Sequence, residues 1–253
     1  YLLWWPFRNT ILTIHDIEAL RRKRGFKRWI FKKLWFDWPI KNARVVTTIS
    51  EFSKSELIKL NNYKTEIKVI YNPLTMPLNY SPKKFNDDCP RILHIGMKEN
   101  KNWRRLIMAL KGIKCELVII GVPNEDALVL LKENHIKYQF KSNLSNEDVE
   151  KEYIVSDMLA FVSTYEGFGL PIIEAQAIGR VILSSNVTSI PEVAGKGALL
   201  VDPYSIDSIR DGVIKLIKNK KFREELIAEG LNNCKRFEVE RIAFQYKDLY
   251  ARL

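Results

Sequence analysis

The sequence STYEGFGLPIIEAQAIG, residues 163–179, decides which fold we expect for this chain. An apolar run at 158–162 leads into it and predicts a buried strand. Pro171 follows the loop where the first turn of a helix would begin, a position at which a missing N–H costs least. Strand, glycine-containing loop and helix in this order predict one βα unit of a parallel α/β sheet.

Two glycines and two carboxylates give this unit the composition of a ligand site. Gly167 and Gly169 let the backbone approach a ligand closely, and the helix N-terminus behind them favours an anion. Glu166 lies in the loop, and Glu174 lies eight residues later on the helix. An ordinary βα turn with two solvated glutamates is the alternative, and the chemistry of the stretch alone leaves it open.

The composition is that of a globular protein in a reducing compartment. Of the 253 residues, 46% are hydrophobic and 28% are charged, and no apolar run approaches the roughly 18 residues of a membrane span. The three cysteines are widely spaced, which indicates neither a zinc site nor a disulfide framework. We expect a cytoplasmic protein that, where it meets a membrane, does so at the inner face. The chain begins with Tyr1 and lacks a signal-peptide pattern, so we expect it to start inside a longer protein.

Positive charge is concentrated in the N-terminal part. Residues 1–78 hold 15 Lys/Arg against 6 Asp/Glu, a net +9, and the rest of the chain holds 26 against 24, a net +2. Eight cations between Arg21 and Lys33 stand among many aromatics, and we expect one helix from Ala19 to Trp38. One apolar stripe of this helix consists of Phe26, Trp29, Ile30 and Leu34, and a second consists of Phe31, Trp35 and Trp38. An interfacial helix on anionic lipid and a helix packed on a sheet with solvated cations are both open interpretations.

The pattern along the rest of the chain predicts a doubly wound α/β protein with one break. Residues 72–90 carry four prolines and little periodicity, which marks a domain boundary. From Arg91 onward, strands and helices alternate as parallel βα units do. Strands are expected at 10–14, 44–49, 66–71, 91–95, 115–120, 137–140, 158–162, 181–184 and 198–201. One helix is expected from a cap at Ser50 or Ser53 to about Leu60. Further helices are expected near 102–112, 124–134, 145–155, 170–179 and 205–218.

Three loops are expected to meet at the carboxyl edge of the second sheet. Gly96–Asn102 carries Lys98 and Lys101, Glu166–Leu170 is the loop quoted above, and Ser184–Glu192 opens a short helix. Two lysines beside two helix N-termini suit a diphosphate and need no metal ion. The chain has no Gly-x-Gly-x-x-Gly, no Walker A loop and no metal-spaced His/Cys cluster, so the motifs favour neither a dinucleotide enzyme, an NTPase nor a metalloenzyme.

Taken together, these motifs resemble the retaining glycosyltransferases of the GT-B fold, family-four type (glycosyl transferases group 1). The segments that resemble the donor-binding domain are Glu166-x7-Glu174, Ser184–Asn186, Pro191–Gly195 and Leu200–Pro203, with Ile95-Gly96, Lys101-Asn102 and Ile119–Gly121 upstream. Those that resemble the later part of the acceptor domain are His15-Asp16, Thr48–Ser50 and Val69–Pro73. The resemblance to the donor-binding domain covers roughly 91–220.

The resemblance implies an α/β fold of two Rossmann-like domains with parallel sheets, the N-terminal one incomplete. The expected parts are a partial acceptor-side domain (1–75), a linker (76–90), a nucleotide-sugar-binding domain (91–235) and a C-terminal helix (236–253) that packs back toward the N-terminal domain. Fewer residues precede the linker than this fold usually carries, so we expect its first βα units to be missing from this chain.

The resemblance also implies catalytic roles. Glu166 would contact hydroxyls of the transferred sugar, and Lys101 would neutralise the leaving diphosphate. His15 would face the reacting centre from the other domain, and domain closure would exclude water. Many members of the family have a cation directly after the glycine of the first loop. Because Met97 stands there in this chain, Lys98 is the candidate for the second cationic role.

Donor binding would involve further residues. Glu174 would accept hydrogen bonds from the nucleotide ribose, and Asn143 and Leu144 are the candidates for contacts with the base. Backbone N–H groups of the glycine loop would hold the diphosphate or the sugar. The donor-binding residues of the loops are Gly96, Gly167, Phe168, Gly169 and Leu170.

The implied reaction is transfer of a sugar from a nucleotide-diphosphate sugar to a glycan or lipid-linked acceptor, with retention and without metal or cofactor, in polysaccharide biosynthesis. The enzyme would be hexosyltransferase- or mannosyltransferase-like, and no nucleic-acid partner is expected. Two alternatives stay open. One is a catalytically incomplete GT-B remnant that binds an anionic membrane surface, and the other is a sugar-nucleotide epimerase of related architecture.

Overall fold

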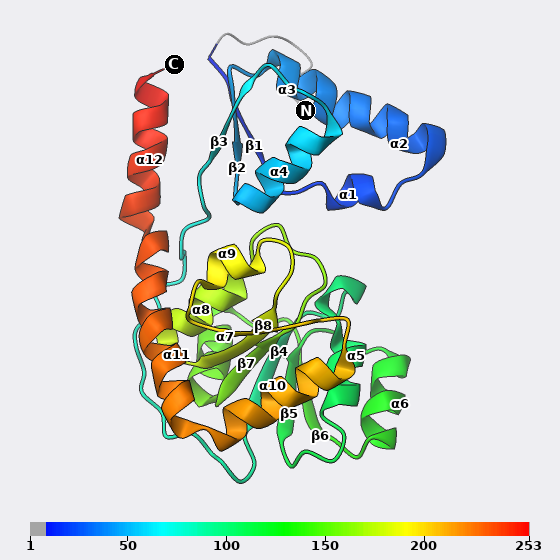
Figure 1. The fold of residues 1–253 in the computed structure, drawn as a ribbon, viewed down its shortest axis with the longest axis vertical. Helices are drawn as coiled ribbons and strands as arrows, with labels where there is room; N and C mark the ends of the chain where they lie inside the picture. Colours follow the sequence, from blue (N-terminus) through cyan, green and yellow to red (C-terminus); the bar gives the residue numbers. More distant parts are fainter. Residues whose placement is uncertain (1–8, 253) are drawn as a thin grey trace. The chain divides into compact units, whose positions relative to one another are not determined.

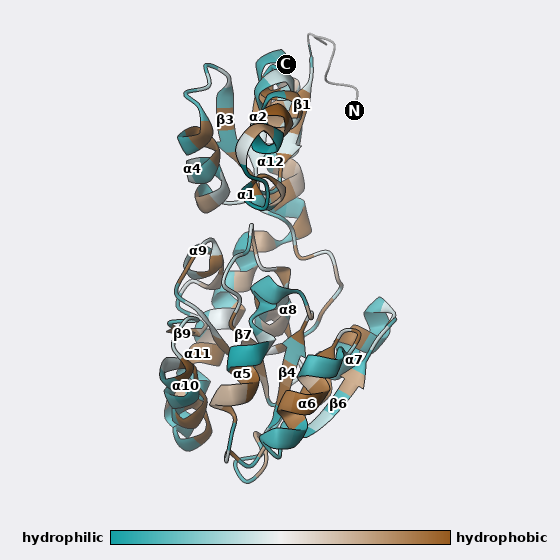
Figure 2. Cartoon of the chain, turned by 90° about the vertical axis from the view of Figure 1, so that its right-hand side faces the viewer, coloured by the Kyte–Doolittle hydropathy of each residue, from teal (hydrophilic) through white to brown (hydrophobic). Residues whose placement is uncertain are grey.

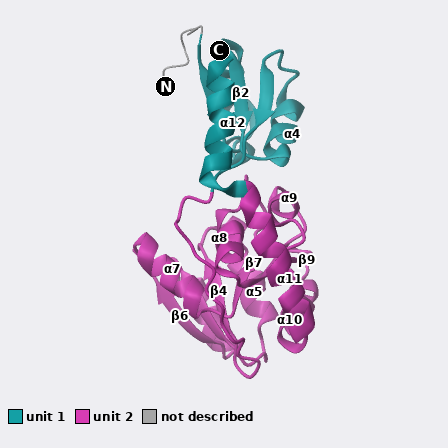
Figure 3. Ribbon diagram, turned by 90° about the vertical axis from the view of Figure 1, so that its left-hand side faces the viewer, with its two compact units in different colours: residues 1–73, 237–253 teal, residues 74–236 magenta. Residues whose placement is uncertain are grey.

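The computed structural model describes residues 9–252, and the chain divides into two compact units (Figure 3). Unit 1 comprises Tyr1–Pro73 and Phe237–Leu253, and unit 2 comprises Leu74–Arg236. The C-terminal helix is therefore part of unit 1. The segment 76–90, expected as a linker, lies within unit 2.

Unit 2 is built around six parallel strands in the order β6-β5-β4-β7-β8-β9 (Figure 1). The chain proceeds outward from β4 to β6 and then returns to place β7 against the free side of β4. The direction of winding therefore reverses between β4 and β7, which makes their carboxyl ends the switch point of the sheet. The strands are β4 (Arg91–Ile95), β5 (Glu116–Ile120), β6 (Lys137–Lys141), β7 (Met158–Phe161), β8 (Val181–Ser185) and β9 (Leu199–Val201).

The helices of unit 2 form two groups. Helix α5 contacts α6 and α10, and α8 contacts α7 and α11. Right-handed crossovers on either side of a switch point place the two groups on opposite faces of the sheet. A sheet that is covered on both faces needs apolar strands. Strand β7 is an example, because all four of its residues are buried. The helices are η3 (Glu99–Lys101), α5 (Trp103–Ala109), α6 (Glu125–Glu133), α7 (Asn146–Val155), α8 (Leu170–Ile178), α9 (Ile190–Ala194), α10 (Ile206–Lys218) and α11 (Lys220–Asn233). The expected doubly wound α/β architecture is confirmed.

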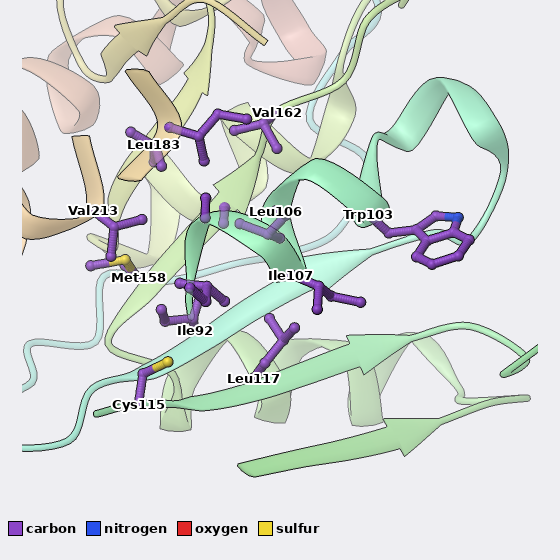
Figure 4. Packing of buried hydrophobic residues seen from close by; sticks show 14 of the residues in the cluster. Ile92, Trp103, Leu106, Ile107, Cys115, Leu117, Met158, Val162, Leu183 and Val213 are labelled. Atoms are coloured by element: carbon purple, nitrogen blue, oxygen red, sulfur yellow. The ribbon is translucent and has the colours of Figure 1, made fainter. Parts of the chain in front are cut away.

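One apolar face of α5 anchors the loop that precedes this helix. Trp103, Leu106 and Ile107 follow the i, i+3, i+4 spacing of a single helix face, and each is at most 1% exposed. They pack in the same cluster as Ile92 of β4 and Leu117 of β5 (Figure 4). The loop between β4 and α5 is therefore held at both ends by the core.

A buried carboxylate joins the amino ends of β4 and β7. Asp157, directly before β7, accepts hydrogen bonds from the backbone N–H of Arg91 at 2.7 Å and of Asn86 at 3.1 Å, and it pairs with Lys83. Phe85 packs against the core of unit 2. These contacts attach the segment before β4 to the sheet.

Unit 1 holds three parallel strands in the order β1-β2-β3, namely β1 (Ile11–Ile14), β2 (Val45–Thr48) and β3 (Glu66–Val69). Its helices are α1 (Glu18–Arg21), α2 (Gly25–Lys32), the π-helical turn η2 (Lys33–Asp37), α3 (Trp38–Asn42), α4 (Glu51–Leu60) and α12 (Val239–Ala251), and the short 3₁₀ helix η4 (Cys234–Phe237) leads into α12. Phe36 and Ile40 pack with Leu57 of α4 in one cluster. In a second cluster, Ile242 and Leu249 of α12 pack with Val45 and Ile70, so the C-terminal helix contributes to the core of this unit (Figure 1).

The structure corrects the expectation of a single helix from Ala19 to Trp38. A turn at 22–24 separates α1 from α2, and Gly25 at the start of α2 has φ of +54°, the left-handed region that favours glycine. The helical run then extends to Asn42 through the π turn. Pro39 explains the wider turn, because it lacks the N–H that an α-helix would donate to the carbonyl of Trp35.

Candidate functional site

The carboxyl ends of β4 and β7 lie side by side at the switch point, and each continues into one of the loops singled out in the sequence. The loop after β4 runs from Gly96 through η3 to Asn102, and the loop after β7 contains Glu166. Open parallel sheets bind ligands in the crevice outside such a point. The candidate site therefore follows from strand order before any side chain is considered.

An ion pair joins these two loops. Lys101 Nζ lies 2.7 Å from Glu166 Oε1, and the two side chains are 19% and 13% exposed. The lysine also lies over the ring of Phe161, at 4.8 Å from the centroid. Its aliphatic stem rests on Gly96, whose φ is +97°; a Cβ built there would lie 2.9 Å from Lys101 Cγ. Gly96 thus has two reasons to be glycine, and Lys101 is held in one direction.

Two asparagines fix the loop after β4. Asn102 adopts the left-handed conformation, with φ of +64°, and its buried Nδ2 donates to the carbonyls of Val162 at 2.9 Å and Pro203 at 2.7 Å. Asn100 Nδ2 donates to the carbonyl of Tyr165 at 2.9 Å. Together they tie the loop to the chain after β7 and to the loop after β9. Asparagine tolerates the left-handed region better than most residues, which explains its use at this position.

Serine hydroxyls connect the third loop to the site. Ser189, fully buried just before α9, places its Oγ 3.0 Å from the carbonyl of Glu166 and 2.9 Å from that of Phe168. At the end of β8, Ser184 and Ser185 donate to carbonyls of the neighbouring strand and its loop. The three loops predicted to meet at this edge are thus joined by hydrogen bonds.

Gly169 directs helix α8 at the site. Its φ of +113° lies in the range that side chains rarely adopt, and a Cβ there would approach Ile172 to 3.2 Å. Leu170 and Pro171 then open the helix, so its positive N-terminal end points to the glycine loop. Gly167 and Phe168 are buried within the same loop.

Glu174 lies one turn into α8 and is paired with a residue of α7. The hydroxyl of Tyr153 donates to Glu174 Oε2 at 2.7 Å. Burial raises the pKa of the Glu174 carboxyl, and the Tyr153 hydrogen bond partly offsets this by lowering it. Burial, followed by the nearby carboxylate, raises the pKa of Tyr153 well above its usual value, so the phenol remains a donor.

His94 is a polar residue of the strand β4 that sequence reasoning missed. It is fully buried, and its Nδ1 donates to the carbonyl of Ala160 at 2.9 Å. Burial lowers the pKa of His94 to about 4, and the charge of Lys101 contributes in the same direction. The imidazole is therefore neutral beside the lysine. A histidine within the apolar strand RILHI is the signal that could have found it.

The remaining predicted residues are less closely gathered. Lys98 is exposed at the start of η3. Asn143 and Leu144 follow β6, which is two strands from β4, so at the usual strand spacing they lie about 10 Å along the sheet edge from the lysine loop. His15 is exposed after β1 in unit 1, and its carbonyl accepts from Ser53 Oγ. Its role toward a site in unit 2 stays a prediction.

Two kinds of feature are absent from the part of the chain that the structure describes. In residues 9–252, no group of three or more His, Cys, Asp or Glu side chains is placed to hold a metal ion. Among the helices of the same residues, none has the length and apolar character needed to cross a bilayer.

Comparisons with known proteins agree with this geometry. A family model described as "Glycosyl transferases group 1" matches residues 79–232. The chain is 30% identical to O-antigen chain mannosyltransferase B of Escherichia coli, over 96% of this chain and 70% of that protein. Among solved structures, sucrose-phosphate synthase of Thermosynechococcus elongatus superimposes with a TM-score of 0.82 at 20% identity, over 96% of this chain and 67% of that one. Anabaena HepE, solved in complex with UDP-glucose, has a TM-score of 0.82 at 18% identity, with coverages of 96% and 72%.

We predict that Asn102→Ala lowers the free energy of unfolding of unit 2 by about 2–4 kcal/mol, because two buried carbonyls lose their donor. Asn102→Gly removes the same hydrogen bonds but relieves the left-handed backbone, so it should cost about 1 kcal/mol less. Native-state hydrogen exchange of the β7 amides measures both values. A loss below about 0.5 kcal/mol in the alanine variant would contradict the structural role given to the amide.

Proposed function

The chain belongs to the group 1 glycosyl transferases, and we propose that it moves a sugar from a nucleotide-diphosphate sugar to a glycan or lipid-linked acceptor, with retention of configuration and without a metal ion. The observation that carries the proposal is the Lys101–Glu166 pair at the switch point of unit 2. This pair places one cation and one carboxylate close enough together for a single sugar phosphate to contact both.

Lys101 would stabilise the leaving group. When the bond between the anomeric carbon and the phosphate oxygen breaks, negative charge grows on the diphosphate. The largely buried side chain of Lys101, held by Gly96 and Phe161, is oriented before the reaction, so its ammonium stabilises that charge without reorganising. Lys98, which is exposed to solvent and precedes Lys101 in the same loop, is the proposed second cation for the diphosphate. Two lysines would perform the task that a divalent metal performs in other transferases.

The N-terminal end of α8 would share this task. Gly169 and Leu170 begin the helix, and the first N–H groups of a helix have no carbonyl partner within it. Together with the positive end of the helix dipole they favour an anion. The bound diphosphate would therefore lie between α8 and the loop that carries Lys101.

Glu166 would hold the sugar being transferred. Its carboxylate accepts from Lys101 through one oxygen, and a carboxylate has room for further donors, such as sugar hydroxyls. In the proposed front-face reaction, the anomeric carbon–phosphate bond breaks and the bond to the acceptor oxygen forms on the same face. The departing phosphate oxygen takes the acceptor's proton. His15 of unit 1 is the proposed residue that positions sugar or acceptor.

Glu174 would hold the nucleotide. Two vicinal ribose hydroxyls can each donate to an ionised carboxylate, and Glu174 sits one turn behind the end of α8 that meets the diphosphate. Tyr153 keeps one of its oxygens in place. Asn143 and Leu144 are the proposed contacts for the base.

The donor and acceptor classes rest on the relatives. The Escherichia coli protein is named an O-antigen chain mannosyltransferase, which supports a hexosyl donor, mannosyl first, and an acceptor in polysaccharide assembly. Anabaena HepE was solved with UDP-glucose, which supports a nucleotide-sugar donor as a class. We place the reaction in the cytoplasm, because the three widely spaced cysteines indicate no disulfide framework.

We predict that Lys101→Ala lowers kcat by about 10²–10³-fold in the full-length protein, since one preorganised charge is removed from the transition state. Glu166→Ala should abolish measurable transfer. The donor is first chosen by thermal shift from a panel of UDP-, GDP- and ADP-sugars, and turnover is followed as nucleoside diphosphate released in the presence of a lipid-linked glycan.

The matched control is Lys132→Ala, which removes an exposed lysine from α6 and should leave turnover unchanged. Wild-type turnover in both Lys101→Ala and Glu166→Ala would overturn the assignment.

The stereochemistry and the metal requirement are tested on the same reaction. We expect the product anomer, read from its proton NMR coupling and chemical shift, to match that of the donor, and we expect excess EDTA to leave the initial rate unchanged. Inversion would exclude the front-face mechanism. Loss of activity with EDTA, restored by Mg²⁺ or Mn²⁺, would show that the lysines do not suffice.

The pKa of Glu174 predicts how donor binding depends on pH. Only the ionised carboxylate can accept from both ribose hydroxyls, so the donor KM should rise as the pH falls through the raised pKa of Glu174. Tyr153→Phe removes a hydrogen bond that lowers this pKa, so its KM should begin to rise at a higher pH while kcat changes little. Glu174→Gln should abolish the transition. A Tyr153→Phe profile that superimposes on the wild type would refute the coupling.

A further inference from the structure

The helical run 25–42 of unit 1 has one face in the core and another in solvent. On the inner face, Phe36 and Ile40 are buried with Ile14 and Leu20. Of the two interpretations left open by the sequence, packing on the sheet is therefore realised. It uses Phe36, which belongs to neither expected aromatic stripe, and it leaves most of both stripes outside the core.

The outer face carries an unusual density of large apolar side chains. Phe26 is 73% exposed and Trp29 56%, and their rings stack at 5.8 Å between centroids. Ile30, Trp35 and Trp38 are between 37% and 49% exposed. We refer to these five residues as the aromatic face; Figure 2 shows hydrophobic and hydrophilic residues mixed along α2. Soluble proteins rarely expose so many large side chains on one segment unless the surface has a partner.

Cations surround the aromatic face. Residues 18–42 hold nine Lys/Arg and only two acids, Glu18 and Asp37. Both acids are engaged by neighbours: Glu18 pairs with Arg22, and Asp37 pairs with Lys32 and Lys33. The cations on the exposed surface include Arg21, Arg22, Arg24, Lys27, Lys33 and Lys41. The segment therefore presents strong net positive charge beside its apolar side chains.

We propose that this surface docks on a lipid bilayer that contains anionic lipids, with α2 lying in the interface. Tryptophan and phenylalanine rings partition into the headgroup boundary, and lysine and arginine pair with lipid phosphates above it. A nucleic-acid duplex would match the cations but would leave five apolar side chains without a role. A single strand that stacked its bases on the four aromatic rings would still leave Ile30 without one. An acidic protein surface would match the charge but would need its own complementary apolar groove. A bilayer satisfies both features, and it does so without any partner of fixed shape.

The proposal is independent of the transfer reaction, because it rests on residues 18–42 of unit 1 alone. If it holds, it gives the enzyme a way to remain where lipid-linked acceptors are found. Its failure would leave the donor site unaffected, and loss of catalysis in Lys101→Ala would leave membrane binding unaffected.

The test uses the full chain and vesicles of two compositions, phosphatidylcholine alone and phosphatidylcholine with about 30% phosphatidylglycerol. We expect co-sedimentation with the anionic vesicles only, weakened by raising NaCl from 0.1 to 0.5 M. Reversing Arg21, Arg22 and Arg24 to Glu should lower the partition coefficient at least about a hundredfold, at roughly 1 kcal/mol for each cation near the surface. Phe26→Ser with Trp29→Ser should lower it at least about tenfold.

Matched controls separate this surface from general effects of charge and exposure. One control variant changes three cations of α10 and α11 to Glu, namely Lys218, Lys220 and Lys221. The other, Phe244→Ser, removes a side chain of α12 that is 69% exposed. Both variants should bind as the wild type does. Brominated lipids provide a test on an otherwise unaltered protein: they should quench tryptophan fluorescence, and less so in Trp29→Phe.

Several results would overturn the proposal. Equal binding to neutral and anionic vesicles would remove the role of the cations, and equal loss in the control variants would remove the role of this surface. A wild-type dimer in solution that the Phe26→Ser, Trp29→Ser variant dissociates, without vesicle binding, would assign the aromatic face to a second copy of the chain.

Discussion

The candidate site depends on the side-chain amide of Asn102. One Nδ2 group donates to carbonyls that follow two different strands, at Val162 and Pro203, and it does so from a left-handed backbone conformation that few side chains tolerate. Lys101 is the preceding residue, so the geometry that satisfies the two carbonyls also sets the direction of the lysine. A hydrogen-bond requirement of the protein interior thereby positions a charge at its surface.

The electrostatics of the site follow from this placement. Lys101 is partly removed from water, and Glu166 offsets the cost at 2.7 Å. His94, buried beneath the same loop, stays neutral because burial and the lysine both disfavour a second cation. On the other side of the glycine loop, Glu174 is buried enough to have a raised pKa. One cation and two carboxylates with different environments are thus arranged around the start of α8.

The sequence predicted the sheet well because its signals are local. Mostly apolar runs match β4, β5, β7, β8 and β9, whereas β6 alternates polar and aromatic residues. The order of the loops brought Lys101 and Glu166 into one site. Tyr153 could not be found in this way. It stands on an ordinary helix, 21 residues before Glu174, and only the packing of α7 against α8 brings the two together. The π turn at Lys33–Asp37 was missed for a similar reason, since stripe counting assumes a constant 3.6 residues per turn.

That π turn also explains how one segment can serve a core and a surface. A wider turn shifts every later residue around the helix axis relative to the earlier ones. Phe36 and Ile40 reach the core of unit 1 from this shifted register, whereas Phe26 and Trp29, before the turn, do not. In an uninterrupted α-helix, different residues of this segment would be buried in the core. The exposure of the aromatic face is therefore a consequence of backbone geometry as well as of composition, and any substitution that removed Pro39 would act on both faces together.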